Sequence, residues 1–221
     1  MSVTRSGAAA LAAGGVLFLL YQTVRPYTGE TGMRGAATMA SSAWVASHTL
    51  AMLAFVLVTL GMVAVHGVLR GRVSGTAAVL TGVGAGLVLP YYGGEAFGLH
   101  AIAARALRDG DPSLMTLVDD FRYGPVAITM FGAGLVLLGA GAVLAAIAAR
   151  RSGVLPAWSM IPLAAASVLL IPQFYGPPAL RVAHGVLLAA GAAWAAWHLF
   201  DARPAARSAR LGHDGVRAVV G

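Results

Sequence analysis

The sequence predicts an all-α integral membrane protein, a single bundle of about six transmembrane helices. Of its 221 residues, 58% are hydrophobic and only 10% are charged, which lies outside the range of soluble globular domains. Long uncharged windows separate the charged residues, and each window has room for one helix of about 20 residues, the length that crosses about 30 Å of hydrocarbon. Glycine and alanine are frequent in these windows, so neighbouring helices can approach closely.

The spans are expected at residues 7–24, 43–67, 76–104, 125–149, 155–172 and 180–200. The first window follows Arg5 and has no small-residue cleavage site before Arg25, so we interpret it as a retained helix and not as a signal peptide. Residues 1–200 are expected to form one domain, the transmembrane bundle. Residues 201–221 are expected to form a polar, arginine-containing tail.

The basic residues indicate orientation and not a nucleic-acid partner. A net charge of +7 would suggest nucleic acid in a soluble chain, but here the arginines lie at the ends of the spans and in the tail. The side that holds both termini has the larger share of them, so the positive-inside rule predicts cytoplasmic termini in the plasma membrane. Cysteine is absent, which excludes disulfides and thiolate metal sites. The oligomeric state stays open.

Glu95 is the most informative residue in the chain. It lies within the third predicted span, in the segment 89–100 (LPYYGGEAFGLH), where an ionisable side chain is costly and by default marks a functional site. Pro90 tends to break the helix, and Gly93 and Gly94 permit an irregular backbone that needs a surrounding cavity at membrane depth. Such a cavity favours the neutral carboxyl group, which makes Glu95 a candidate proton donor. The alternative is an interfacial glutamate that reaches water.

Acids, histidines and aromatic residues gather in the same half of the predicted bundle. A carboxylic acid among aromatic rings suits protonation of an alkene or epoxide, because ring faces stabilise the carbocation that forms. The candidate catalytic residues are Glu95, Asp119, Asp120 and His100. The candidate substrate-binding residues are Tyr91, Tyr92, Phe97, Trp44, His48, Phe121, Tyr123, Phe174, Tyr175, Arg181 and His184.

Simpler explanations exist for several of these residues. Tryptophan and tyrosine concentrate at membrane interfaces regardless of function. Asp119 and Asp120 belong to a segment rich in charges, which a solvated loop would also explain. A Glu95 that donates a proton also needs hydrogen-bond donors for the carboxylate left behind. The candidates for that role are His48, His100, Tyr91, Tyr92, Arg122, Arg181 and His184.

Three segments resemble the small actinobacterial integral membrane terpene cyclases of the drimentine-pathway type, which are similar in kind to the fungal meroterpenoid cyclases. These segments are 89–100 (LPYYGGEAFGLH), 121–125 (FRYGP) and 171–184 (IPQFYGPPALRVAH). The resemblance implies proton-initiated cyclisation of a prenyl chain, typically a farnesyl group on an aromatic or indole-derived substrate, without a metal or other cofactor. Fungal members use two acidic residues. Glu95 matches one, and Asp119, Asp120 or Glu30 is the candidate for the second.

Two other functions fit parts of the pattern. His48 and His66 lie on the second predicted span and His184 and His198 on the sixth, so the pairs His48/His184 and His66/His198 suit a b-type haem cytochrome. The depths of the two pairs match poorly, because the histidines are spaced differently on the two helices. A proton-coupled transporter of a small solute would also explain a buried acid beside a proline.

Overall fold

The computed structural model describes residues 3–202, and every regular element in that range is helical. In chain order the elements are α1 (Val3–Val24), α2 (Gly32–Met39), α3 (Ser42–Leu69), α4 (Arg72–Gly93), the π-helix η1 (Gly94–Leu99), α5 (His100–Asp109), the 3₁₀-helix η2 (Pro112–Met115), α6 (Thr116–Arg122), α7 (Pro125–Ser152), α8 (Ile161–Val168), the 3₁₀-helix η3 (Pro172–Tyr175) and α9 (Pro178–Asp201). Beyond residue 202, the predicted tail lies outside the described residues.

Five helices in the described part of the chain are long and apolar enough to cross a membrane, one fewer than the sequence predicts. Four of them, α1, α3, α7 and α9, coincide with predicted windows. The fifth is a continuous helix of 38 residues, Arg72–Asp109, in which η1 joins α4 to α5. At about 1.5 Å per residue it is about 57 Å long, well beyond the thickness of a bilayer core.

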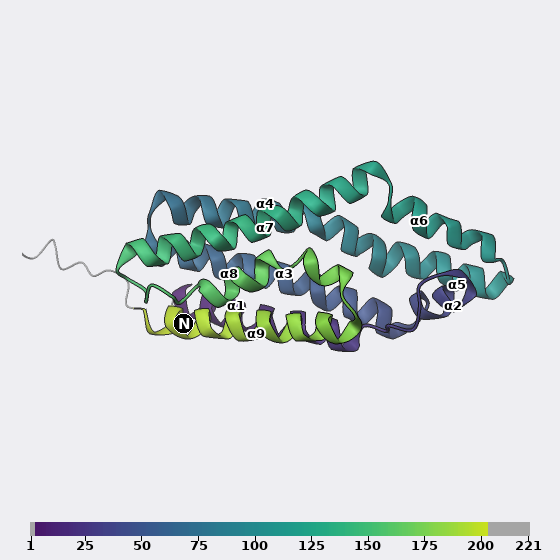
Figure 1. Ribbon diagram of the computed structural model, residues 1–221, viewed down its shortest axis with the longest axis horizontal. Helices are drawn as coiled ribbons and strands as arrows, with labels where there is room; N and C mark the ends of the chain where they lie inside the picture. The colour runs from purple at the N-terminus through teal and green to yellow at the C-terminus, as the bar shows by residue number, and fades with distance from the viewer. Residues whose placement is uncertain (1–2, 203–221) are drawn as a thin grey trace, which may run out of the picture.

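The prediction of a spanning helix at 155–172 is wrong, because the segment contains only the eight-residue helix α8 and part of η3. Its prolines explain the interruption. Pro156 directly precedes a turn, Pro162 is the second residue of α8, and Pro172 begins η3. Each lacks the amide hydrogen that a continuing helix needs. The segment still runs back along α7 and α9, so the beginning of α1 and the end of α9 lie at the same end of the bundle (Figure 1).

A helical cap, formed by α2, α5, η2 and α6, covers the other end of the bundle (Figure 1). The sequence did not predict it. The cap has its own hydrophobic core, which includes the beginning of α3 and the end of η1. That core consists of Ala36, Met39, Trp44, Leu99, Ala103, Ala106, Met115 and Val118. Apolar packing therefore fixes the cap to the ends of the long helices.

Within the bundle, α1 packs between α3 and α9, while α4 packs closely against α7. The contact between α4 and α7 depends on two glycines that face each other. A Cβ atom on Gly84 would lie 2.7 Å from the carbonyl oxygen of Gly134, and a Cβ on Gly134 would lie 2.8 Å from that of Gly84. Neither position has room for a larger side chain, so the two backbones touch directly.

We expect Gly84→Ala to lower the thermal stability of the purified protein in detergent, because overpacking a close contact typically costs about 1–3 kcal/mol. Gly86→Ala is the matched control. It lies on the same helix, and its Cβ would meet no atom within 4 Å. Both changes add the same helix propensity, so only the contact with α7 separates them. Equal melting temperatures of the two variants would show that the glycine contact does not hold α4 against α7.

Candidate functional site

A cavity of about 390 Å³ lies where the ends of the long helices meet the cap. Its volume falls within the range of small-molecule sites, about 300–1,000 Å³. Charged side chains lie on one part of its wall, and aromatic and aliphatic side chains form the rest. The lining residues are Tyr21, Arg25, Glu30, His48, Tyr91, Tyr92, Glu95, Arg122, Tyr123, Ile128, Phe131, Gly132, Leu135, Ile171, Phe174, Tyr175 and Arg181.

Glu95 enters this cavity from the π-helical turn η1. The sequence predicted a break at Pro90, but the helix continues through Pro90, and the irregularity lies in η1, as the adjacent glycines suggested. π-Helical turns are rare and are frequent at functional sites. The indole Nε1 of Trp44 donates a hydrogen bond of 2.7 Å to the Glu95 carbonyl oxygen. This bond holds the turn against α3 and fixes the backbone from which the carboxylate projects.

The Glu95 carboxylate is held by two parallel hydrogen bonds from Arg122. The Arg122 Nε lies 2.7 Å from Oε1, and its Nη2 lies 2.8 Å from Oε2. Arg122 is the last residue of α6, so the bond joins the cap to the long helix. The side chains are 7% and 13% exposed, which makes this a largely buried pair. Two-point contacts of this kind are the strong form of the arginine–carboxylate interaction.

Glu30 extends the pair into a network of four charges. Its Oε2 lies 2.7 Å from Nη1 of Arg122, and its Oε1 lies 2.6 Å from Nη2 of Arg25. The indole of Trp44 lies behind both arginines, with its ring centroid 5.2 Å from Cζ of Arg25 and 5.7 Å from Cζ of Arg122. Each arginine in the network thus has a carboxylate partner and an aromatic face.

The network favours the charged form of Arg122. Burial alone would lower the pKa of Arg122, but the hydrogen bonds and charges of Glu95 and Glu30 outweigh burial and raise that pKa. At Glu95, for which the sequence predicted a neutral acid, the structure shows two hydrogen bonds from Arg122 to the carboxyl group. The sequence left seven candidates for the hydrogen-bond donor to the Glu95 carboxylate, and in the structure that donor is Arg122.

Aromatic rings form a second part of the wall. Tyr92 is buried and lies in edge contact with Tyr21 and Phe55, at centroid distances of 5.6 and 5.5 Å. Tyr91 stacks on Phe131 at 4.2 Å, and Phe131 in turn lies 5.8 Å from Phe174. These rings come from α1, α3, α4, α7 and η3, so the wall is assembled only when the bundle closes.

His48 presents a neutral imidazole nitrogen beside this wall. Its Nδ1 lies 2.8 Å from the backbone carbonyl oxygen of Trp44. Because a carbonyl oxygen can only accept a hydrogen bond, Nδ1 must be the donor. The proton is therefore on Nδ1, and Nε2 is left as the unprotonated nitrogen. The ring lies 5.7 Å from that of Tyr21 and 5.8 Å from that of Tyr92. His48 is thus available as a weak base within the cavity lining.

The structure brings together about half of the residues that the sequence singled out. Eight of the predicted site residues line the cavity: Glu95, Tyr91, Tyr92, His48, Tyr123, Phe174, Tyr175 and Arg181. Trp44 and Phe121 lie just behind it, where Trp44 faces the arginines and Phe121 packs against Tyr91 at 5.2 Å. These ten positions form one connected region.

The remaining predicted residues lie elsewhere. Asp119 and Asp120 are exposed on α6, and Phe97 is 58% exposed on η1. His100 bonds through Nδ1 to the carbonyl oxygen of Met39 and so holds α2 in the cap. His184 is buried but does not line the cavity. Of the three candidates that the sequence left open for a second acid, Asp119, Asp120 and Glu30, Glu30 is the one that lines this cavity.

Sequence reasoning missed Arg25, Tyr21 and Phe131 as site residues. Arg25 and Glu30 border the short connection between α1 and α2, and two opposite charges so close to a predicted span were the available signal. Tyr21 lies one helical turn before Arg25 on the same face. Phe131 lies in the middle of an apolar run, and nothing in the sequence separates it from a lipid-facing residue.

The histidines of the haem alternative are engaged in other contacts. His184 Nε2 bonds to the carbonyl oxygen of Ala166 at 2.8 Å, and His66 Nδ1 bonds to Oγ of Ser74 at 3.0 Å. His198 packs between two tryptophan rings. Among the described residues, no group of three or more histidine or acidic side chains is arranged to hold a metal ion.

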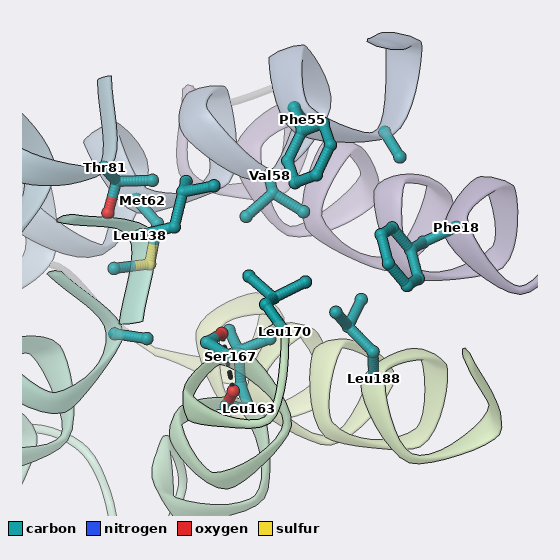
Figure 2. Close-up of a pocket in the computed structure, with 12 residues that line it drawn as sticks. Phe18, Phe55, Val58, Met62, Thr81, Leu138, Leu163, Ser167, Leu170 and Leu188 are labelled. Carbon is teal, nitrogen blue, oxygen red and sulfur yellow. Dashed lines mark hydrogen bonds between the residues drawn. The ribbon is translucent and has the colours of Figure 1, made fainter. Parts of the chain in front are cut away.

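A second, smaller void lies deeper in the bundle (Figure 2). The side chains of Phe18, Val58 and Leu170 converge around it. Its volume is only about 30 Å³, which is the volume that one molecule occupies in liquid water. It has no charged side chain in its wall, and its lining hydroxyls on Thr81 and Ser167 bond to backbone carbonyls of their own helices. The larger cavity at the cap is therefore the candidate site.

Comparison with protein-family models, with curated proteins and with solved structures finds no match for this chain. The chemistry of the site is therefore argued from its geometry.

We expect Arg122→Gln to destabilise the protein by about 3 kcal/mol, because it leaves the buried Glu95 carboxylate without its partner. The double variant Glu95→Gln/Arg122→Gln should recover much of that loss, since no unpaired charge remains buried. Thermal unfolding in a neutral detergent measures both effects. Arg105→Gln, which breaks an exposed pair with Asp109, is the control and should cost under about 1 kcal/mol. A double variant as unstable as Arg122→Gln would contradict this account.

Proposed function

We propose that this chain is a membrane-embedded terpene cyclase that converts a lipophilic prenylated substrate into a cyclic isomer. The observation that carries the proposal is the position of Glu95. Its carboxylate is buried, is held by Arg122, and lines a ligand-sized cavity that is also lined by aromatic rings. The resemblance to terpene cyclases around residues 89–100 points to the same reaction.

The acid step requires a proton donor strong enough to protonate an alkene. Glu95 takes a proton from water and passes it to one carbon of the prenyl double bond, whose π electrons form the new C–H bond. The neighbouring carbon becomes the carbocation, and the returning carboxylate is stabilised by Arg122.

The carbocation then needs a wall that stabilises positive charge without trapping it. Ring faces do so by cation–π attraction, worth about 2 kcal/mol or more in a desolvated site. Tyr92, Tyr21 and Phe131 supply such rings. The next double bond of the prenyl chain attacks the cation and closes a ring. Loss of a proton to a base, for which Nε2 of His48 is the candidate, gives a neutral product with the same mass as the substrate.

The candidate membrane spans support a location in the lipid bilayer, where prenylated substrates dissolve. Glu95 lies about 35 Å along the helix from Arg72, at about 1.5 Å per residue, which is just beyond one bilayer core. The site would therefore lie at the membrane boundary, within reach of water for the proton and of lipid for the substrate. The arginine distribution favours cytoplasmic termini, hence a site on the outer half of the plasma membrane.

We expect Glu95→Gln to abolish conversion of a farnesylated aromatic substrate, because the amide is nearly the same shape but cannot supply the proton. Membranes containing the variant would be incubated with substrate and analysed for isomeric products by chromatography and mass spectrometry. Normal yield and a monodisperse purified variant would establish that the protein folds. The matched control is Asp120→Asn, which removes an exposed carboxylate on the cap and should keep turnover. Turnover by Glu95→Gln would refute the role of Glu95.

A further inference from the structure

The cavity has more positive than negative groups in its lining. Three guanidinium groups face two carboxylates. Arg25 and Arg122 share Glu30 and Glu95, as described above, whereas Arg181 has no carboxylate within ion-pair distance among the described residues. A cation in a cavity at a membrane boundary is costly unless it meets an anion. The balance of charge therefore leaves room for one further negative group.

Arg181 is held in place by its neighbours, but not all of its donors are used. Its Nη2 donates to the carbonyl oxygen of Phe174 at 2.7 Å, and its Nε makes a longer bond of 3.4 Å to that of Gly176. These bonds orient the guanidinium group and leave Nη1 without an acceptor among residues 3–202. The rings of Phe174 and Tyr27 lie 5.8 and 5.9 Å from its Cζ. Arginine held in this way is preorganised for an oxyanion.

A second arginine, Arg25, contacts the ring of the same tyrosine, Tyr27. Cζ of Arg25 is 5.5 Å from the ring centroid of Tyr27, whose hydroxyl is fixed by a bond to Oε1 of Gln22 at 2.9 Å. Within residues 3–202, Nη2 of Arg25 donates to Glu30, and Nε of Arg25 is buried and has no hydrogen-bond partner. Tyr27 thus contacts two guanidinium groups, and each keeps a donor that no described residue fills.

We propose that Arg181, together with Arg25 across Tyr27, binds an anionic group at the head of the substrate, a carboxylate or a phosphate. The inference rests on the proposed function only in taking the rest of that substrate to be a prenyl chain. The anion is held and not cleaved, so no bond at the head group breaks. With the head at Arg181, the chain extends along the aromatic wall formed by Phe174 and Phe131, which is continuous with Tyr91 beside Glu95. The polar end thus fixes which part of the chain reaches the acid.

Binding to the purified protein in a neutral detergent tests this proposal without any turnover. The probes are farnesyl monophosphate, farnesoic acid in its ionised form, and neutral farnesol, which share one chain and differ at the head. We expect at least one of the two anions to bind about tenfold or more tightly than farnesol, with a preference that shrinks as salt is added. The stronger of the two anionic probes identifies the head group as phosphate or carboxylate.

Substitutions separate anion binding from a merely structural role of Arg181. Arg181→Gln should remove the preference for the anion and leave the affinity for farnesol within about twofold of the original. Arg181→Lys keeps the charge and should keep most of the preference, although lysine cannot make the same bonds to Phe174 and Gly176. If Arg181 only held the turn before α9, both substitutions would weaken the binding of farnesol as much as the binding of the anions. Arg72→Gln, an exposed arginine at the opposite end of the bundle, is the control.

Equal affinity of the unsubstituted protein for farnesol and both anions would overturn the proposal, as would an anion preference that survives in Arg181→Gln. These outcomes are distinct from failure of the cyclase proposal. An anion preference that depends on Arg181, in a protein that cyclises no substrate, would support the binding site and count against the cyclase. Cyclisation of neutral substrates by a protein without any anion preference would support the cyclase and count against the anion-binding site.

Discussion

The ion pair between Arg122 and Glu95 is the interaction on which the rest of this structure depends. Arg122 ends the last helix of the cap, and Glu95 lies in the π-helical turn of the longest helix, so their two hydrogen bonds close the cap over the bundle. Glu30 and Arg25 belong to the same network, and they attach the segment between α1 and α2 to Arg122. Isolated burial of any one of these charges would cost several kcal/mol, and their mutual pairing offsets that cost.

The same pair sets the chemistry that the site can perform. An arginine held against a carboxylate by two hydrogen bonds stabilises the anion that remains after the acid has given up its proton. The aromatic wall and the neutral His48 complete the site without a further charged group on that side. The arginine excess at Arg181 lies at the other polar edge, where a substrate head group would bind.

Local sequence predicted what depends on local composition. The apolar windows indicated α1, α3, α7 and α9, and the cost of a charge in such a window indicated Glu95. The interrupted α8 was missed because hydropathy does not register how Pro156 and Pro162 divide a segment. The helix passes through Pro90, and the irregular turn is η1, which begins four residues later at Gly94. Asp119 and Asp120 were predicted as site residues because they lie close to a span in the sequence. Glu30 lines the cavity because of contacts with distant segments, such as its ion pair with Arg122, which the sequence does not reveal.

The most direct test of the central claim is turnover in deuterium oxide. If Glu95 passes a solvent-derived proton to the prenyl double bond, the cyclic product carries one deuterium on the carbon that was protonated, and Glu95→Gln gives no product. Magnetic resonance and mass spectrometry of the product locate the label. A cyclic product without deuterium at that carbon would contradict proton-initiated cyclisation, and labelled product from Glu95→Gln would show that another group is the acid.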